Sequence, residues 1–163
     1  MLPTLMRTTL GGRFVEFMRS ERGKELDKFL VRNFGFSLLM RTFAARVGFP
    51  PIPVLLLYTI GKKSGEEREA VMPYIGYEGR LYLIGANGAK PKPAAWVGNV
   101  LAHPDVRIIV DRRERLVRGR LVEPGSEERE RVWSFAATMT PQYNTYQSQM
   151  TVPAPVIVLE PRT

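Results

Sequence analysis

The residues best suited to bind an anion lie together in one short segment. It reads Gly61-Lys62-Lys63-Ser64-Gly65, and Arg68 follows three residues later. Glycines at both ends suit a tight turn, which would expose two ammonium groups, a hydroxyl and free backbone N–H groups at one point. Phosphate and carboxylate groups bind to donors of this kind. A solvated surface turn often has the same composition, so the segment alone is compatible with an anion receptor or with a plain hairpin turn.

A second candidate site is the glycine-rich loop Gly85–Pro93 and the helix predicted after it, from about Ala94 to Ala102. Glycines let a ligand approach the backbone, and a helix N-terminus offers unpaired N–H groups. Trp96 and Asn99 are three residues apart and share one face of this helix. Trp96 could stack on a flat ring or simply pack in the core. Asn99 stands in an apolar turn, where a buried amide must find hydrogen-bond partners.

A third candidate is the polar segment Pro141–Gln149, which we expect to be a loop. It carries Tyr143 and Tyr146, three residues apart among amides and hydroxyls, and is too polar for a core stripe. The two tyrosines could line a pocket and donate protons, or the loop could simply cap the sheet.

Composition narrows the chemistry that these residues can do. The chain has 163 residues, a net charge of +8 and no cysteine, and its one histidine is His103. Thiol catalysis and polyhistidine metal sites are therefore excluded, and an imported cofactor is expected to supply the reactivity. The positive charge favours an anionic partner. No apolar run reaches the roughly 20 residues of a membrane span, and the N-terminus has no secretory signal, so we expect a cytoplasmic protein.

The first fifty residues are predicted to be helical. Apolar residues recur there at spacings of three and four, which is typical of an amphipathic helix; they are Leu26, Phe29, Leu30, Phe34 and Leu38. The run Pro50-Pro51-Ile52-Pro53 ends this region. We therefore divide the chain into an N-terminal helical segment, residues 1–53, and a second domain, residues 54–163.

The second domain has the pattern of an antiparallel sheet. Six strands are expected, joined mostly by hairpins, at Val54–Ile60, Ala70–Tyr77, Arg80–Ile84, Val106–Val110, Arg115–Val122 and Pro155–Leu159. A further helix is predicted from Ser126, as its N-cap, to about Met139. The fold class is mainly β with helical cover, and the hairpins suggest a small β-barrel.

The order of these segments resembles the deazaflavin-dependent nitroreductase family. The resemblance rests on the strand before the basic turn, the Trp-x-x-Asn helix and the Pro-x-Tyr-x-x-Tyr-Gln segment, and it covers roughly residues 54–161. Members of that family adopt a split β-barrel and bind coenzyme F420, whose tail carries phosphate and glutamates. Three positions depart from the family pattern: Ala86 stands where serine is usual, Thr140 stands where some members have tyrosine, and a proline usual near Val71 is displaced to Pro73.

The resemblance implies a role for each candidate residue. Four would hold the anionic tail: Lys62, Lys63, Ser64 and Arg68. Seven would surround the deazaflavin ring: Ala70, Val71 and Met72 by their backbone, with Ala86, Asn87, Trp96 and Asn99. Tyr143 and Tyr146 would shape the substrate pocket and assist proton delivery.

The sequence therefore predicts an oxidoreductase that passes a hydride from reduced F420 to a flat acceptor, a quinone or a nitroaromatic. The alternatives are an FMN-dependent split-barrel enzyme and a non-catalytic cofactor or nucleic-acid binder. Nucleic-acid binding is disfavoured, because the charge gathers at loops and in the N-terminal helix rather than along a sheet face with exposed aromatics. A quinone substrate would suit peripheral contact of residues 1–50 with an anionic membrane.

Overall fold

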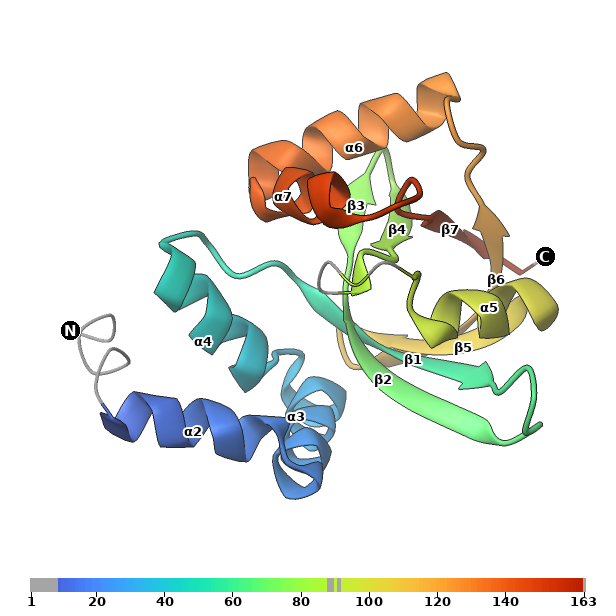
Figure 1. Cartoon of the computed structure of the whole chain (residues 1–163). Helices are drawn as coiled ribbons and strands as arrows, with labels where there is room; N and C mark the ends of the chain where they lie inside the picture. The colour runs from blue at the N-terminus through green and yellow to red at the C-terminus, as the bar shows by residue number, and fades with distance from the viewer. Residues whose placement is uncertain (1–8, 88–89, 91, 163) are drawn as a thin grey trace.

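Seven antiparallel strands form a single sheet that is covered by helices (Figure 1). The computed structural model describes residues 9–87, 90 and 92–162. The sheet order is β2-β1-β5-β6-β7-β4-β3. The strands are β1 (Val54–Ile60), β2 (Glu67–Pro73), β3 (Ile75–Tyr77), β4 (Arg80–Ile84), β5 (Asp105–Val110), β6 (Arg113–Leu121) and β7 (Val156–Pro161). The predicted antiparallel sheet with helical cover is confirmed.

The prediction of one strand from Ala70 to Tyr77 is wrong, because the chain changes partners within it. β2 pairs with β1, whereas β3 pairs with β4. Between them the backbone N–H of Tyr74 leaves both ladders and donates to the carbonyl of Pro53 at 3.0 Å. β2 and β3 thus become the two edges of the sheet although they are neighbours in sequence. This split produces seven strands in place of the six that we expected.

Two tight hairpin turns fix the register of two strand pairs, β3 with β4 and β5 with β6. Glu78 and Gly79 join β3 to β4, and Asp111 and Arg112 join β5 to β6. All four residues have positive φ, between 48° and 74°. A two-residue loop with this backbone matches the right-handed twist of its flanking strands. The second turn is shorter than the gap between the two strands predicted there, which end at Val110 and begin at Arg115, because β6 begins at Arg113.

Six helices are described: α2 (Thr9–Arg19), α3 (Glu21–Phe34), α4 (Leu38–Val47), α5 (Ala95–Ala102), α6 (Glu127–Met139) and α7 (Gln142–Gln149). In this part of the chain, none of them is both long and apolar enough to cross a membrane. Ser126 caps α6 as predicted, since its hydroxyl accepts from the backbone N–H of Arg129 at 3.2 Å. The predicted helix over 94–102 is confirmed as α5.

The prediction of a loop at Pro141–Gln149 is wrong, because this segment forms α7. Pro141 has φ −61° and ψ −14°, so its ring already holds the backbone in helical geometry where α7 begins. The indole of Trp133 on α6 donates to the side-chain oxygen of Asn144 at 3.0 Å. Burial of Tyr143 in the core beside α6 adds to this contact. Tertiary packing therefore outweighs the weak helix propensity of a Tyr-, Asn- and Thr-containing segment.

The N-terminal helices are present, but three of the apolar residues whose spacing predicted α3 are exposed to solvent. Phe29 and Phe34 are 52% and 61% exposed, and Leu26 is exposed as well. The buried residues of α3 are Gly23, Asp27 and Val31. A Cβ on Gly23 would lie 2.1 Å from the carbonyl oxygen of Phe17, so only glycine permits this close approach to α2.

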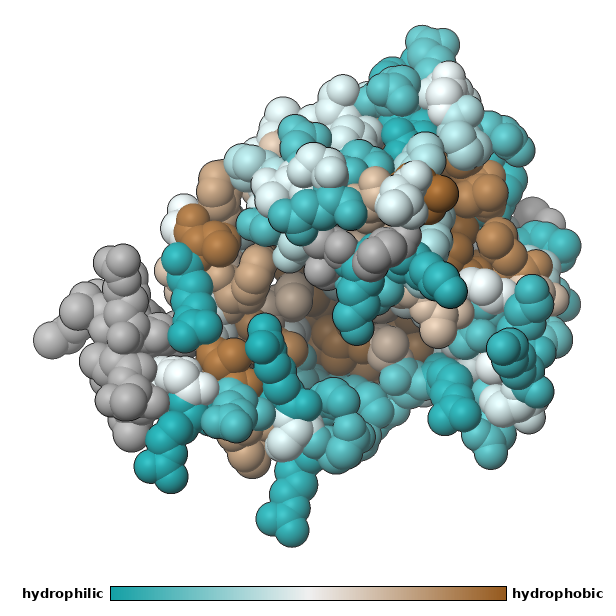
Figure 2. Space-filling model, in the orientation of Figure 1, coloured by the Kyte–Doolittle hydropathy of each residue, from teal (hydrophilic) through white to brown (hydrophobic). Residues whose placement is uncertain are grey.

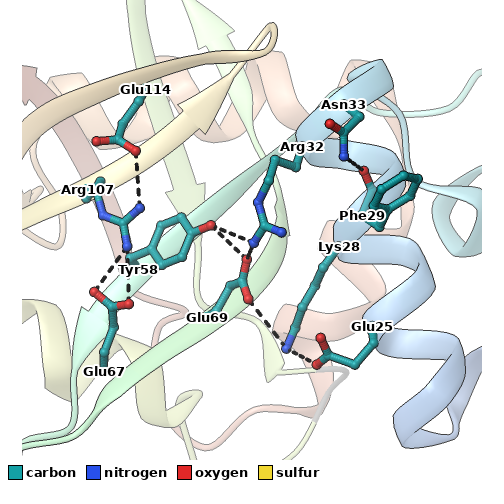
Figure 3. Close-up of polar contacts among 10 residues, drawn as sticks. All are labelled: Glu25, Lys28, Phe29, Arg32, Asn33, Tyr58, Glu67, Glu69, Arg107 and Glu114. Atoms are coloured by element: carbon teal, nitrogen blue, oxygen red, sulfur yellow. Dashed lines mark hydrogen bonds and ion pairs between the residues drawn. The ribbon is translucent and has the colours of Figure 1, made fainter.

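Polar side chains attach α3 to the outer face of the sheet (Figure 3). Arg32 donates to the hydroxyl of Tyr58 at 3.0 Å and forms an ion pair with Glu69. The Tyr58 hydroxyl donates to Glu69 at 2.8 Å, and Lys28 approaches the same carboxylate at 3.8 Å. Burial raises the pKa of Tyr58, which keeps this hydroxyl protonated as a donor. The guanidinium of Arg107 stacks on the Tyr58 ring at 3.6 Å. This cluster links α3 to both β1 and β2.

A buried carboxylate on α3 holds the start of α4. Asp27 is 3% exposed and accepts hydrogen bonds from the hydroxyl of Ser37 at 2.6 Å and from the backbone N–H of Leu38 at 2.7 Å and of Leu39 at 3.2 Å. These N–H groups have no intrahelical acceptor, because they lie in the first turn of α4. Asp27 therefore caps α4 from a neighbouring helix and fixes the angle between the two.

We expect Asp27→Ala to lower the free energy of unfolding by about 2–4 kcal/mol, because it leaves buried donors without an acceptor. Asp27→Asn should cost less, since its carbonyl oxygen still accepts from the backbone N–H groups. Urea unfolding of both variants measures the difference. Equal losses in the two variants would contradict the capping role.

Candidate functional site

The basic segment forms the tight turn between β1 and β2 that its glycines predict. The N–H of Gly61 donates to the carbonyl of Glu66, and that of Gly65 donates to Gly61, both at 2.8 Å. Gly65 has φ +70°, a conformation that L side chains rarely adopt. A Cβ on Gly61 would lie 2.4 Å from the hydroxyl oxygen of Ser64. Both glycines are therefore needed for this turn.

The cationic side chains of the turn are exposed to solvent. Lys62, Lys63 and Ser64 are exposed, and Arg68 reaches back from β2 towards them. The guanidinium of Arg68 donates to Glu66 at 2.7 Å and lies 3.5 Å from the hydroxyl of Ser64. Three positive charges and a hydroxyl thus converge on one corner of the molecule.

This turn forms one end of a pocket of about 620 Å³, which we call the basic pocket. Its opposite wall is α5. The pocket brings together seven of the residues singled out from the sequence: Lys62, Lys63, Ser64, Arg68, Ala70, Trp96 and Asn99. Residues more than thirty positions apart in the chain therefore share one site, as we expected.

Sequence reasoning missed several residues that line the basic pocket. They are Leu57, Thr59, Ala95 and Gly98. Ala95, Gly98 and Asn99 follow the three- and four-residue spacing of one helix face, and an added Cβ on Gly98 would meet nothing within 4 Å. Small residues at that spacing were the signal of an open helix face. Thr59 gave a weaker signal, as a hydroxyl within the apolar run of β1.

Asn99 satisfies its side-chain amide within the protein. Its oxygen accepts from the backbone N–H of Lys62 at 3.0 Å, and its nitrogen donates to the hydroxyl of Thr59 at 3.3 Å. The expectation that this amide must find partners is confirmed. Its partners come from the basic turn and from β1.

The edge strand β2 presents different residues to its two sides. Ala70 lines the basic pocket, and Met72 packs in the core cluster beneath it. The side chain of Val71 points to the other face and packs against Val54 and Leu56. No strand in the described part of the chain pairs with the outer edge of β2, so backbone groups along this edge are open to a ligand.

Ala86 and Asn87 line neither this pocket nor the one described next. Ala86 is buried in the core cluster that packs against α6. Asn87 has φ +48° and donates from its side chain to the carbonyl of Lys92 at 2.8 Å. Residues 88, 89 and 91 of the same loop lie outside the described residues.

Tyr143 and Tyr146 lie in a second pocket of about 100 Å³, between α4 and α7, which we call the apolar pocket. Its walls are mostly hydrocarbon, and they include Met40, Phe43, Ala44 and Val47 of α4. No pattern in the sequence indicated that α4 would share a pocket with the tyrosines. Figure 2 shows a hydrophobic hollow between the part of the molecule that carries α6 and α7 and the part that carries α3 and β2.

Burial sets the chemistry of the two tyrosines. It raises the pKa of Tyr143 to about 12, with a smaller contribution from Tyr146. It also raises the pKa of Tyr146, against the opposing effect of a hydrogen bond with Gln142. Both hydroxyls are therefore protonated at neutral pH and act as hydrogen-bond donors.

β2 connects the two pockets. Ala70 lines the basic pocket and Pro73 lines the apolar pocket. The two residues are three positions apart, which is roughly 10 Å along a strand. Because side chains alternate along a strand, the two point to opposite faces, so the two pockets lie on either side of the free edge of β2.

Comparisons with known proteins point to one family of reductases. Residues 36–161 match the model of the F420H2-dependent quinone reductase family. The chain is 32% identical over 149 residues to the F420H2-dependent quinone reductase Rv1261c of Mycobacterium tuberculosis, covering 85% of this chain and 99% of that protein. It is 30% identical over 112 residues to the putative F420H2-dependent quinone reductase Rv3178 of the same species, covering 69% and 92%.

A solved structure of an F420H2-dependent reductase, FDR-A, has a similar fold. Its TM-score is 0.59 at 30% identity, and the likeness covers 66% of this chain and 94% of that one. The expected split β-barrel is thereby confirmed. The family model covers most of this chain, including every residue that lines either pocket. The chain therefore belongs to the F420H2-dependent quinone reductase family, and it is an oxidoreductase that uses the deazaflavin coenzyme F420.

Proposed function

We propose that the chain transfers a hydride from reduced F420 to a quinone, with the coenzyme in the basic pocket and the quinone in the apolar pocket. The observation that carries this proposal is that β2 joins the two pockets. One pocket offers cations and the other offers hydrocarbon with a few hydroxyl donors. The two ends of the site therefore suit an anionic coenzyme tail and an apolar acceptor.

The residues of the basic turn fit the tail of F420. Its phosphate and glutamates are anions, and Lys62, Lys63 and Arg68 present cations at the mouth of the pocket. The hydroxyl of Ser64 adds a donor, and Arg68 can offer two parallel N–H groups to a phosphate or carboxylate. The pocket volume of about 620 Å³ is in the range of cofactor sites.

The deazaflavin ring would lie between β2 and α5. The backbone of Ala70, Val71 and Met72 supplies hydrogen-bonding groups at the free edge of the strand, and Trp96 supplies an apolar surface on the other side. Ala86 and Asn87 would contribute only through the backbone of their loop, because the side chain of Ala86 is in the core. When bound, reduced F420 supplies the hydride.

The apolar pocket fits a quinone. The side chains of α4 exclude water from one wall, and the protonated hydroxyl of Tyr143 can donate to a quinone carbonyl from the other. This hydrogen bond stabilises the negative charge that develops on the oxygen as the hydride arrives. A quinone that takes up one hydride also needs one proton to become a hydroquinone. Tyr143 and Tyr146 would hold that proton at the carbonyl and be reprotonated from solvent.

Turnover and binding assays distinguish this proposal from two alternatives. A nitroaromatic is a second flat acceptor, and it would be favoured if it turned over faster than quinones of similar size. FMN is the alternative cofactor, and it would be favoured if it bound more tightly than F420 in a titration. The family assignment argues for F420.

Replacing Lys62 and Lys63 with alanine should weaken F420 binding about tenfold at low ionic strength and much less at high salt, because the contact is between exposed charges. Fluorescence titration of the coenzyme measures both affinities. Lys24→Ala is the matched control, since Lys24 pairs with Glu21 on the surface of α3. An equal loss at all salt concentrations would show that the lysines do not act through charge.

Tyr143→Phe should lower kcat/KM for the quinone about tenfold, because one hydrogen bond to the acceptor is lost. F420 affinity should not change. The pKa of Tyr143 is raised above its value in an unfolded chain, so the donor persists at all lower pH and is lost only as pH rises towards 12. The ratio of wild-type to variant rates should thus stay constant between about pH 6 and 9. A ratio that decreases between about pH 6 and 9 would contradict the assignment of Tyr143 as the hydrogen-bond donor.

We further propose that α3 rests on a membrane surface, where lipid-soluble quinones are found. Leu26, Phe29 and Phe34 form an exposed apolar stripe on this helix. The neighbouring cations Lys24, Lys28 and Arg32 form ion pairs within the chain, so the apolar side chains carry the larger part of this proposal.

Phe29→Ser with Phe34→Ser should reduce flotation of the protein with anionic vesicles, because burial of apolar area in the interface is lost. The control is Leu116→Ser, which removes a residue of similar exposure (58%) from β6. Equal flotation of the wild type and the double variant would remove the membrane proposal and leave the enzyme proposal untouched.

A further inference from the structure

Asn99 stands out among the residues of the basic pocket because both ends of its amide are already bonded. Its oxygen holds the backbone N–H of Lys62, the first lysine of the turn, at 3.0 Å. Its nitrogen is anchored on Thr59, the penultimate residue of β1, at 3.3 Å. One side chain from α5 thus ties the turn to the strand that precedes it.

The basic turn has few other restraints. Within the described residues, its internal hydrogen bonds run from Gly61 to Glu66, from Gly65 to Gly61 and from Glu66 to Ser64. Lys62 and Lys63 are exposed, and no ion pair is recorded for either in this part of the chain. The bond from Asn99 is therefore the contact that fixes the first lysine from outside the turn.

Thr59 makes this anchor rigid. It is only 4% exposed, and its χ1 angle is restricted because its side chain is β-branched. The backbone N–H of Lys62 can only donate, so the amide oxygen of Asn99 must face the turn, and the amide nitrogen then donates to the hydroxyl of Thr59. α5 is packed against β1 and β6, which holds the other end of the link.

We propose that Asn99 is a positioning residue for the anion-binding turn and not a ligand of the deazaflavin ring. This inference rests on the proposed binding of the F420 tail at Lys62, Lys63 and Arg68. Asn99 holds the turn in its binding shape before the coenzyme arrives, so that the ordering cost is not taken from the binding free energy. Thr59 acts through Asn99 in the same way.

The test compares two ligands that differ only in the tail. Intact F420 carries the phosphate and glutamates, whereas the deazaflavin chromophore without them carries only the ring end. Dissociation constants for both are measured by fluorescence with the wild type, Asn99→Ala and Thr59→Val. Asn33→Ala is the matched control, because Asn33 is an exposed amide on α3 that donates to the carbonyl of Phe29 and does not line the basic pocket.

We expect Asn99→Ala to weaken binding of intact F420 about tenfold and to change binding of the tail-less chromophore less than about twofold. Thr59→Val should act in the same direction and more weakly, since it removes only the anchor of the amide. Asn33→Ala should change neither. A second test adds Asn99→Ala to the variant that already carries Lys62→Ala and Lys63→Ala. The effect of Asn99→Ala on F420 affinity should be smaller there, because the cations that Asn99 positions are gone.

Hydrogen exchange supplies a readout without any ligand. The amide of Lys62 should be protected in the wild type and exchange faster in Asn99→Ala and in Thr59→Val, while the amides of β1 keep their protection. If Asn99→Ala does not fold, Thr59→Val still tests whether the link from Asn99 restrains the turn.

Three results would overturn the inference. Equal weakening of both ligands would make Asn99 a ring contact, and additive effects with the lysine variants would mean the same. Unchanged affinity with unchanged exchange at Lys62 would show that the turn does not need the link. Failure of the wild type to bind F420 at all is a different result, which overturns the proposed function and with it this role.

Discussion

The alternation of side chains along one edge strand, β2, is the constraint on which the rest of the structure depends. Successive residues of a strand point to opposite faces. Glu67 and Glu69 therefore face outwards, where Arg107 and Arg32 pair with them. Arg68 and Ala70 face the basic pocket. A shift of the register by one residue would exchange the two sets and place carboxylates where the pocket needs cations.

The outer ion pairs also explain how the two parts of the chain become one site. They attach α3 to the sheet, and Asp27 of α3 fixes the start of α4. α4 then lies beside α7 and forms the far wall of the apolar pocket. The helical segment that the sequence separates at residue 53 is thus part of the proposed acceptor site. Its attachment is mainly polar, which leaves large apolar side chains of α3 exposed.

The basic pocket divides its polar groups between two tasks. The amide of Asn99 hydrogen-bonds to the turn and to the hydroxyl of Thr59, and these two bonds hold the turn to β1. The ammonium groups of Lys62 and Lys63 are exposed and remain open to an anion. Arg68 stands between these cases, because Glu66 neutralises part of its charge. Exposed pairs of this kind are weak, about 0–1 kcal/mol, so an anionic ligand can compete for the guanidinium.

The sequence by itself determined the features that are local. The glycine positions predicted the basic turn, and the serine before α6 marked the start of that helix. The order of these motifs was enough to indicate the family, the fold and the cofactor. Spacing within α5 also placed Trp96 and Asn99 on one side of the same pocket.

Only the tertiary structure decided what depends on contacts between distant segments. The polar residues of α7 become helical because α6 and the core give Tyr143 and Asn144 their partners. Asn99 holds the turn because α5 packs beside β1, 40 positions earlier in the chain. The apolar spacing of α3 was misleading, since Val31 and the residues that form ion pairs, not its phenylalanines, face the sheet. Periodicity shows which residues share a face, but the free energy of the folded contacts decides which face is buried.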